Sequence, residues 1–320
     1  MPVGPEAMSQ DVAQQALSHW GISDAKVTLI AQRENTVFRV KTGTSTDYAL
    51  RLHRPGYQST AAIRSELDWM RHLGRSGIQL PTPVPLPSGA LMIEQGGYCI
   101  DLLSWLDGEP LGKSGVPLDL RDRTGVFLAI GQTLAQIHDA SDSWSVPDGF
   151  TRPSWGLEGL LGDEPLWGRF WENPALSAED AAILSRVRQE ARAVLQNGSF
   201  DFGLIHADFV RENVLINRTT VQVIDFDDCC FGYRLFDVAT ALIKNRREPD
   251  YPDLESALLQ GYGSVRELDK AFLPLFMLLR ALTYVGWIVP RLHEPGGLKR
   301  QESFLQTAMP LAQDFLDQLG

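Results

Sequence analysis

The chain has 320 residues, of which 44% are hydrophobic and 22% charged, and its formal net charge is −11. This composition is typical of a globular protein with a sizeable core, and the length predicts one large or two medium domains. The acidic excess argues against a nucleic-acid-binding protein, whose phosphate contacts require a basic face. It leaves two interpretations open: ordinary solubility, or a negative potential that attracts a cationic substrate.

Cysteine usage and hydropathy indicate the compartment. The three cysteines are Cys99, Cys229 and Cys230, and an adjacent pair cannot bridge without strain, so we expect reduced thiols. The first fifteen residues show no basic segment followed by an apolar run, and the longest apolar stretch, residues 273–289, is interrupted by Arg280. We therefore expect a cytoplasmic protein without a signal peptide or a membrane span.

The first hundred residues alternate between helical and strand-like patterns. Ser9 can cap a helix that runs to about Trp20, and a second helix is predicted from about Thr60 to Leu73. Pro81, Pro83, Pro85 and Pro87 then impose an extended linker. The predicted strands are residues 27–32, 36–41, 48–53, 90–94 and 98–103. This pattern predicts a small antiparallel sheet with one helix beside it.

The character changes after the segment Ser104–Gly108. Apolar spacing predicts helices from about residue 120 to 137 and from 177 to 195, and a helical chain beyond Phe236. Short strands are expected only at residues 203–205, 214–216 and 221–225. The sequence therefore predicts an α+β protein in which a β-rich part precedes a longer, mainly helical part.

The most informative stretch is Leu204–Ile216, in which His206, Asp208 and Asn213 form the pattern H-x-D-x-x-x-x-N. Phosphoryl transfer requires a positioned acceptor and metal ions that neutralise the phosphates. Asp208 can accept the proton of an acceptor hydroxyl group, and Asn213 offers a neutral oxygen to a hard cation. His206 precedes the base and is expected to support the loop.

Two carboxylates follow in the segment Ile224–Asp228. Asp225, at the end of the strand predicted at residues 221–225, offers an anionic metal ligand. We expect the hairpin between residues 214 and 225 to bring Asn213 and Asp225 together. Asp227 is either a further metal ligand or a solvated loop acid.

This pattern, followed closely by a strand that ends in an aspartate, resembles the aminoglycoside phosphotransferase and choline kinase group, distant relatives of the protein kinases. The resemblance covers nearly the whole chain. It implies a bilobal protein-kinase-like fold, with a nucleotide-binding lobe over residues 1–103, a hinge at 104–108, and a helical lobe over 109–320 that carries the catalytic loop and the acceptor site. It also implies ATP and Mg²⁺ as cofactors.

The resemblance assigns further residues to the site. Arg51 stands where the third strand of these enzymes carries a phosphate-binding lysine, and Glu66 would be its ion-pair partner. Ser104 and Leu106 lie in a segment similar to the hinge that binds adenine through main-chain groups. Asp237 resembles the aspartate that braces the catalytic loop.

Three departures from the protein-kinase pattern favour a small-molecule acceptor. Residues 33–36, Arg-Glu-Asn-Thr, replace the glycine-rich loop, and Val210 stands where the catalytic-loop lysine would be. Only eleven residues separate Asp225 from Asp237, too few for a long activation segment. Arg51 itself departs from the family's lysine, although its fork can hold phosphate oxygens.

The predicted function is therefore ATP-dependent phosphoryl transfer to the hydroxyl group of a small molecule, such as an aminoglycoside or an amino alcohol. The acidic composition favours a cationic acceptor, and the helical segment with Arg280, Tyr284, Trp287 and Arg291 is expected to line its pocket, with cation–π contacts from the aromatic rings. Two alternatives stay open: a serine/threonine protein kinase of the stress-response type in the same group, and an inactive nucleotide-binding kinase fold.

Overall fold

The chain forms two compact units in the computed structural model, which describes residues 5–32, 35–43 and 46–319. The first unit comprises residues 1–109, 143–152 and 215–227, and the second comprises residues 110–142, 153–214 and 228–320. In the described ranges, no helix combines the length and the apolar character that crossing a membrane requires.

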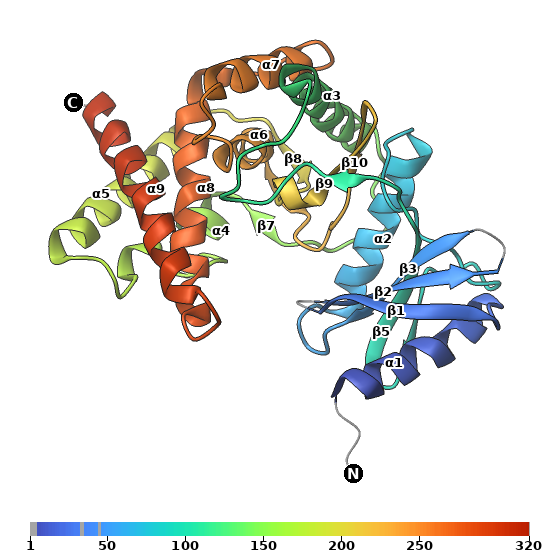
Figure 1. The fold of residues 1–320 in the computed structure, drawn as a ribbon. Helices are drawn as coiled ribbons and strands as arrows, with labels where there is room; N and C mark the ends of the chain where they lie inside the picture. The colour runs from blue at the N-terminus through green and yellow to red at the C-terminus, as the bar shows by residue number, and fades with distance from the viewer. Residues whose placement is uncertain (1–4, 33–34, 44–45, 320) are drawn as a thin grey trace. The chain divides into compact units, whose positions relative to one another are not determined.

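A five-stranded antiparallel sheet forms the first unit, in the order β1-β2-β3-β5-β4 (Figure 1). The expected antiparallel sheet is confirmed. Its strands are β1 (Ala25–Gln32), β2 (Asn35–Thr42), β3 (Asp47–His53), β4 (Met92–Gln95) and β5 (Tyr98–Ser104). Of the segment that replaces the glycine-rich loop, residues 33 and 34 lie outside the described residues, and Asn35 and Thr36 open β2.

Two helices belong to the first unit. Helix α1 (Pro5–Ala16) continues into the 3₁₀ turn η1 (Leu17–Trp20), and α2 (Thr60–Arg75) is capped by the Ser59 hydroxyl, which accepts from the Ala62 amide at 3.2 Å. The helix predicted from Ser9 begins earlier, at Pro5, because proline fits the first turn of a helix.

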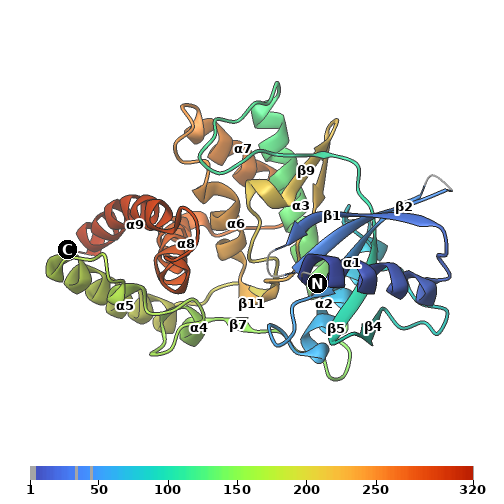
Figure 2. The ribbon, with the colours of Figure 1, turned by 60° about the horizontal axis from the view of Figure 1, so that its bottom comes forward.

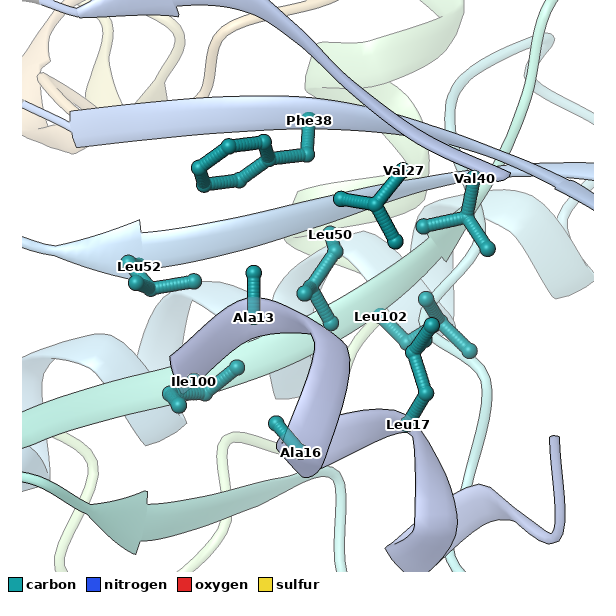
Figure 3. Packing of buried hydrophobic residues seen from close by; sticks show 10 residues of the cluster. All are labelled: Ala13, Ala16, Leu17, Val27, Phe38, Val40, Leu50, Leu52, Ile100 and Leu102. Atoms are coloured by element: carbon teal, nitrogen blue, oxygen red, sulfur yellow. The ribbon is translucent and has the colours of Figure 1, made fainter. Parts of the chain in front are cut away.

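One face of the sheet packs on α1. Figure 3 shows the buried cluster, in which side chains of α1 and η1 meet alternate positions of the strands: Ala13, Ala16, Leu17, Val27, Phe38, Val40, Leu50, Leu52, Ile100 and Leu102. Because side chains alternate along a strand, Arg51, between Leu50 and Leu52, points to the opposite face. The apolar pattern of β3 thus aims one charged residue away from this cluster.

The second unit is mainly helical, as expected beyond Phe236 (Figure 2). Helix α3 packs against α7, α6 against α8, and α8 against α9. The helices are α3 (Arg123–Asp142), α4 (Leu157–Leu161), α5 (Ala178–Asn197), α6 (Arg234–Ile243), α7 (Tyr251–Gly263), α8 (Leu273–Trp287) and α9 (Gly297–Leu319). Short 3₁₀ turns lie at η2 (Phe170–Glu172), η3 (Arg211–Asn213), η4 (Lys270–Phe272) and η5 (Val289–Arg291).

Helices α3 and α7 cross at two glycines. A Cβ on Gly131 would lie 2.0 Å from the Leu258 carbonyl oxygen, and one on Gly261 would lie 1.9 Å from that of Leu128. Both distances are far below van der Waals contact, so neither position can carry a side chain without separating the helices.

Short strands complete the fold. One sheet has the order β7-β11-β8, and another has the order β10-β9-β6. These strands are β6 (Glu109–Pro110), β7 (Ser154–Trp155), β8 (Phe202–Ile205), β9 (Val214–Asn217), β10 (Thr220–Val223) and β11 (Cys230–Tyr233). The strand predicted to end at Asp225 ends instead at Val223. Asp225 adopts φ 65°, which is outside the β region, so the strand cannot continue through it.

Candidate functional site

In the second unit, the catalytic-loop candidates follow β8 and are attached to α6. Asp237, fully buried, accepts hydrogen bonds from the main-chain amides of His206 at 2.8 Å and Ala207 at 2.6 Å. Ala207 adopts φ 68°, a left-handed conformation that costs about 1–3 kcal/mol in a non-glycine residue and persists only where its surroundings fix it. These contacts support the bracing role predicted for Asp237.

A buried histidine holds the bracing carboxylate in turn. His138 Nε2 lies 3.2 Å from Asp237 Oδ2, and His138 Nδ1 lies 2.7 Å from the Tyr262 hydroxyl. Burial alone would raise the pKa of Asp237, but the hydrogen bond and charge of His138, with further contributions from His206, hold it below its ordinary value. Asp237 thus stays an acceptor for the two loop amides.

Asp208 lies at the centre of this loop with both carboxylate oxygens engaged. Asn213 Nδ2 donates to Oδ2 at 2.9 Å and to the Asp208 carbonyl at 3.0 Å, while Arg280 Nη2 donates to Oδ1 at 2.7 Å. The Asp208 amide donates to His206 Nδ1 at 3.3 Å. Asp208 is therefore held in one orientation from three sides, and 28% of its side chain stays exposed.

Asn213 is the last residue of the 3₁₀ turn η3, and side-chain contacts of Arg211, the first residue, hold this turn in place. Buried Arg211 donates to Asn245 Oδ1 at 2.8 Å and to Glu248 Oε1 at 2.7 Å. The side-chain nitrogen of Asn213 donates hydrogen bonds to Asp208. Its side-chain oxygen is therefore the atom that could coordinate a hard cation.

In the first unit, Arg51 binds three carboxylates on the sheet face opposite the α1 cluster. Its Nε and Nη2 each lie 3.0 Å from an oxygen of Asp101, which faces it in the β3–β5 register. Its Nη1 lies 2.7 Å from Glu66 Oε1 and 3.5 Å from Asp227 Oδ1. Burial disfavours the charge, but Asp101, Glu66 and Asp227 outweigh it and raise the pKa of Arg51 well above its ordinary value.

The ion pair predicted between Arg51 and Glu66 is thus present, within a larger cluster. Asp101 also accepts from His53 Nε2 at 2.5 Å. The sequence analysis did not find Asp101 or His53. An arginine within the apolar strand β3 signals that a carboxylate must face it, but identifying that carboxylate requires the strand register.

Asp227 is buried at the edge of this cluster. Its carboxylate accepts from the Asn35 side chain and from Arg51, and its carbonyl accepts from Arg152 Nη2 and, at 2.9 Å, from Gln58 Nε2. Burial, with repulsion from Glu66 and Asp225, raises the pKa of Asp227 to about 8. The interpretation of Asp227 as a solvated loop acid is therefore wrong, because only 11% of its side chain is exposed.

The donor set of this loop fits a magnesium ion. Asp225 is exposed, and its charge and that of Asp227 repel each other enough to contribute to the raised pKa of Asp227. A divalent cation would neutralise that excess. Two carboxylates suffice for Mg²⁺, since this ion takes one or two of them and completes its shell with water and phosphate oxygens.

Two main-chain amides of the predicted hinge are already hydrogen-bonded. The Ser104 amide donates to the Thr82 carbonyl at 2.9 Å, and the Trp105 amide donates to that of Asp47 at 3.2 Å. Within the part of the chain that the structure describes, the Leu106 amide has no such partner. An adenine ring would therefore find its donor at Leu106 rather than at Ser104.

The aromatic residues expected to line the acceptor pocket already carry cations of the chain itself. Lys244 Nζ lies 3.8 Å from the centre of the Tyr284 ring, and Arg280 Cζ lies 4.2 Å from it. Arg291 covers Trp287 at 4.4 Å. The expectation that the Tyr284 and Trp287 rings bind a cationic acceptor is not supported, since side chains of the protein already form cation–π contacts with both rings.

Comparison with known proteins shows the family of the chain. A model of the phosphotransferase enzyme family matches residues 26–272. The solved structure of a microcompartment-associated aminopropanol kinase is 32% identical, with a TM-score of 0.82 over 97% of this chain and 98% of that one. A homoserine kinase of Gluconobacter oxydans is 30% identical, covering 75% of this chain and 74% of that protein. An amicoumacin kinase of Bacillus subtilis is 24% identical, covering 87% and 84%.

These findings confirm the predicted α+β kinase-like fold, with an antiparallel-sheet N-terminal part and a helical C-terminal part. They also confirm the predicted type of reaction, ATP-dependent phosphoryl transfer to a hydroxyl group of a small molecule. The family model spans most of the chain, so the chain belongs to the phosphotransferase enzyme family.

Proposed function

We propose that this protein transfers the γ-phosphoryl group of Mg²⁺-bound ATP to the hydroxyl group of a small amino alcohol. The observation that carries the proposal is the likeness to aminopropanol kinase, which extends over nearly the full length of both chains. The Asp208 loop supplies what such a transfer requires, because it offers a carboxylate held in one orientation.

Asp208 is the proposed base. The acceptor oxygen forms a bond to the γ-phosphorus, the bond from that phosphorus to the β,γ-bridging oxygen breaks, ADP leaves with the electron pair, and the hydroxyl proton passes to Asp208. Asn213 and Arg280 keep the Asp208 carboxylate in place, while His206 and Asp237 hold the loop.

The nucleotide side of the proposal assigns the remaining residues. In the first unit, Asp225 and Asp227 would hold Mg²⁺, which when bound neutralises phosphate charge. In the second unit, the Asn213 oxygen is a further candidate metal ligand. Leu106 would bind adenine through its amide. Arg51 acts as a positioning residue that orients Asp227, with Glu66 as its partner, because most of its donors are already bound to carboxylates.

The test is an ADP-release assay with Mg²⁺-ATP and a panel of ethanolamine, 1-amino-2-propanol, 3-amino-1-propanol, homoserine, choline and an aminoglycoside. Casein serves as the protein acceptor. We expect turnover of at least one amino alcohol that depends on Mg²⁺ and is lost in Asp208→Asn. Phosphorylation of casein without turnover of any small hydroxyl compound would contradict the proposal and favour a protein kinase.

A further inference from the structure

Lys244 places a half-buried ammonium group beside the catalytic loop. It follows the last turn of α6, and its Nζ lies 3.8 Å from the Tyr284 ring centre and 4.8 Å from that of Phe304. Burial, with the nearby charge of Arg280, lowers the pKa of Lys244 to about 8. A cation in this position is costly unless an anion accompanies it.

Asp208 and Glu212 attract the Lys244 charge, but neither forms an ion pair with it among the described residues. Asp208 is engaged by Arg280 and Asn213. Glu212 accepts from the Ser114 amide at 2.6 Å and from its hydroxyl at 3.2 Å. In residues 5–32, 35–43 and 46–319, no carboxylate oxygen lies within 4.0 Å of the Lys244 ammonium. The ammonium lies against the rings of Tyr284 and Phe304, which compensate a buried cation only in part.

Arg280 adds a second cation to the same ring. It is 4% exposed, and its Cζ lies 4.2 Å from the Tyr284 ring centre while its Nη2 bonds to Asp208. Its Nε is buried and has no hydrogen-bond partner among the described residues. Two cations therefore share one tyrosine ring next to the proposed base, and one of them keeps an unused donor.

We propose that Lys244 and Arg280 form a subsite for an anionic group of the acceptor, so that the preferred acceptors are amino alcohols that also carry a carboxylate, that is, hydroxy amino acids. This inference rests on the proposed function. Because Arg280 contacts Asp208, the subsite lies beside the proposed base. The anionic group and the reacting hydroxyl of the acceptor would therefore be separated by only a few covalent bonds. A carboxylate there would receive charge-assisted hydrogen bonds from both cations.

Matched pairs of acceptors test the inference without any mutation. Threonine and 1-amino-2-propanol, homoserine and 3-amino-1-propanol, and serine and ethanolamine differ only in the carboxylate. We expect the carboxylate-bearing member of at least one pair to have a kcat/KM at least about tenfold higher, the effect of one charge-assisted hydrogen bond. A preference for the decarboxylated member in every active pair would overturn the inference and leave the proposed function intact.

The variant Lys244→Met separates acceptor binding from other roles of the cation. We expect it to abolish the preference within a pair while the KM for ATP stays unchanged, and Lys244→Arg to retain it. Lys299→Met, on an exposed position of α9, is the matched control. If Lys244→Met lowered kcat equally for both members, the ammonium would serve the transferring phosphoryl group, and the subsite assignment would be wrong.

Failure of the proposed function has a different signature. In that case neither member of any pair is turned over by the wild-type protein, although it binds the nucleotide. Thermal melting of each variant shows that it folds, and calorimetric titration of the acceptors in the presence of a non-hydrolysable ATP analogue measures the same preference without turnover. Equal affinity for both members in the wild-type protein would count against the subsite.

Discussion

The two units differ in the sign of the charge that predominates among their buried ionisable groups. In the first unit, carboxylates outnumber the cation that they surround: Arg51 faces Asp101, Glu66 and Asp227. In the second unit, the residues beside Asp208 are basic, and Lys244 has no carboxylate within ion-pair distance among the described residues. The first cluster has three carboxylates for two arginines, Arg51 and Arg152, whereas the second has, at Lys244, a cation without an ion-paired carboxylate in the described part of the chain. The difference predicts which ligand each binds, a metal ion in the first and an anionic group in the second.

The largest effect is expected for Asp208→Asn. The substitution keeps the size of the side chain but removes the proton acceptor, so kcat should fall by roughly 10²–10⁴-fold. Single-turnover kinetics with saturating Mg²⁺-ATP measures it. Nucleotide affinity, measured by calorimetry, should stay within about twofold, and near-full turnover would exclude Asp208 from the mechanism.

Arg51→Met should come next and should act on stability. It leaves Asp101 and Glu66 buried without their main cation, and breaking a buried pair in this way costs about 3–5 kcal/mol. Denaturant unfolding measures the loss. Arg51→Lys should recover only part of it, since an ammonium cannot form the two parallel bonds to Asp101. Wild-type stability of both variants would show that the cluster contributes little.

Arg152→Lys tests whether the edge of the first cluster serves nucleotide binding. Arg152 donates to the Asp227 carbonyl, the Gln58 side chain and the Ala62 carbonyl, so it fixes the proposed metal loop to α2. We expect the KM for Mg²⁺-ATP to rise about tenfold, the value of one lost hydrogen bond to a charged group. The KM for the acceptor should not change, and an equal change in both constants would indicate general loosening.

The smallest effect concerns Asp227→Asn in the metal-free protein. The pKa of Asp227 is raised from 3.8 to about 8, so its contribution to stability is present at low pH and is lost as the pH rises through this interval. The variant should therefore melt about 2–4 °C above the wild type at pH 8, with a smaller difference at pH 5. Differential scanning calorimetry at the two pH values tests this, and a difference independent of pH would contradict it.

The sequence predicted the local parts of the site better than its long-range parts. His206, Asp208 and Asn213 could be identified because a short loop fixes their spacing. Asp101 could not, because its partner Arg51 lies fifty residues earlier and meets it only through the strand register. The end of β10 was misjudged because the apolar run continues into Ile224, while the positive φ of Asp225 leaves no trace in the sequence.

The basic surroundings of Asp208 were hidden for a related reason. The total charge of the chain is negative and favoured a cationic acceptor, but a total does not say where charges gather. Lys244 follows α6, while Arg280 and Tyr284 lie on α8, and only the packing of these two helices brings the three residues together.

The glycine crossing of α3 and α7 has a consequence for the chemistry far from it. Gly261 immediately precedes Tyr262, whose hydroxyl bonds to His138 on α3, and His138 holds Asp237 under the catalytic loop. The distance between the two helices therefore sets the length of a chain of hydrogen bonds that ends at the amides of His206 and Ala207. A single methyl group at Gly261 would separate the helices and lengthen that chain of hydrogen bonds. Turnover would then change although no residue of either proposed ligand site is substituted.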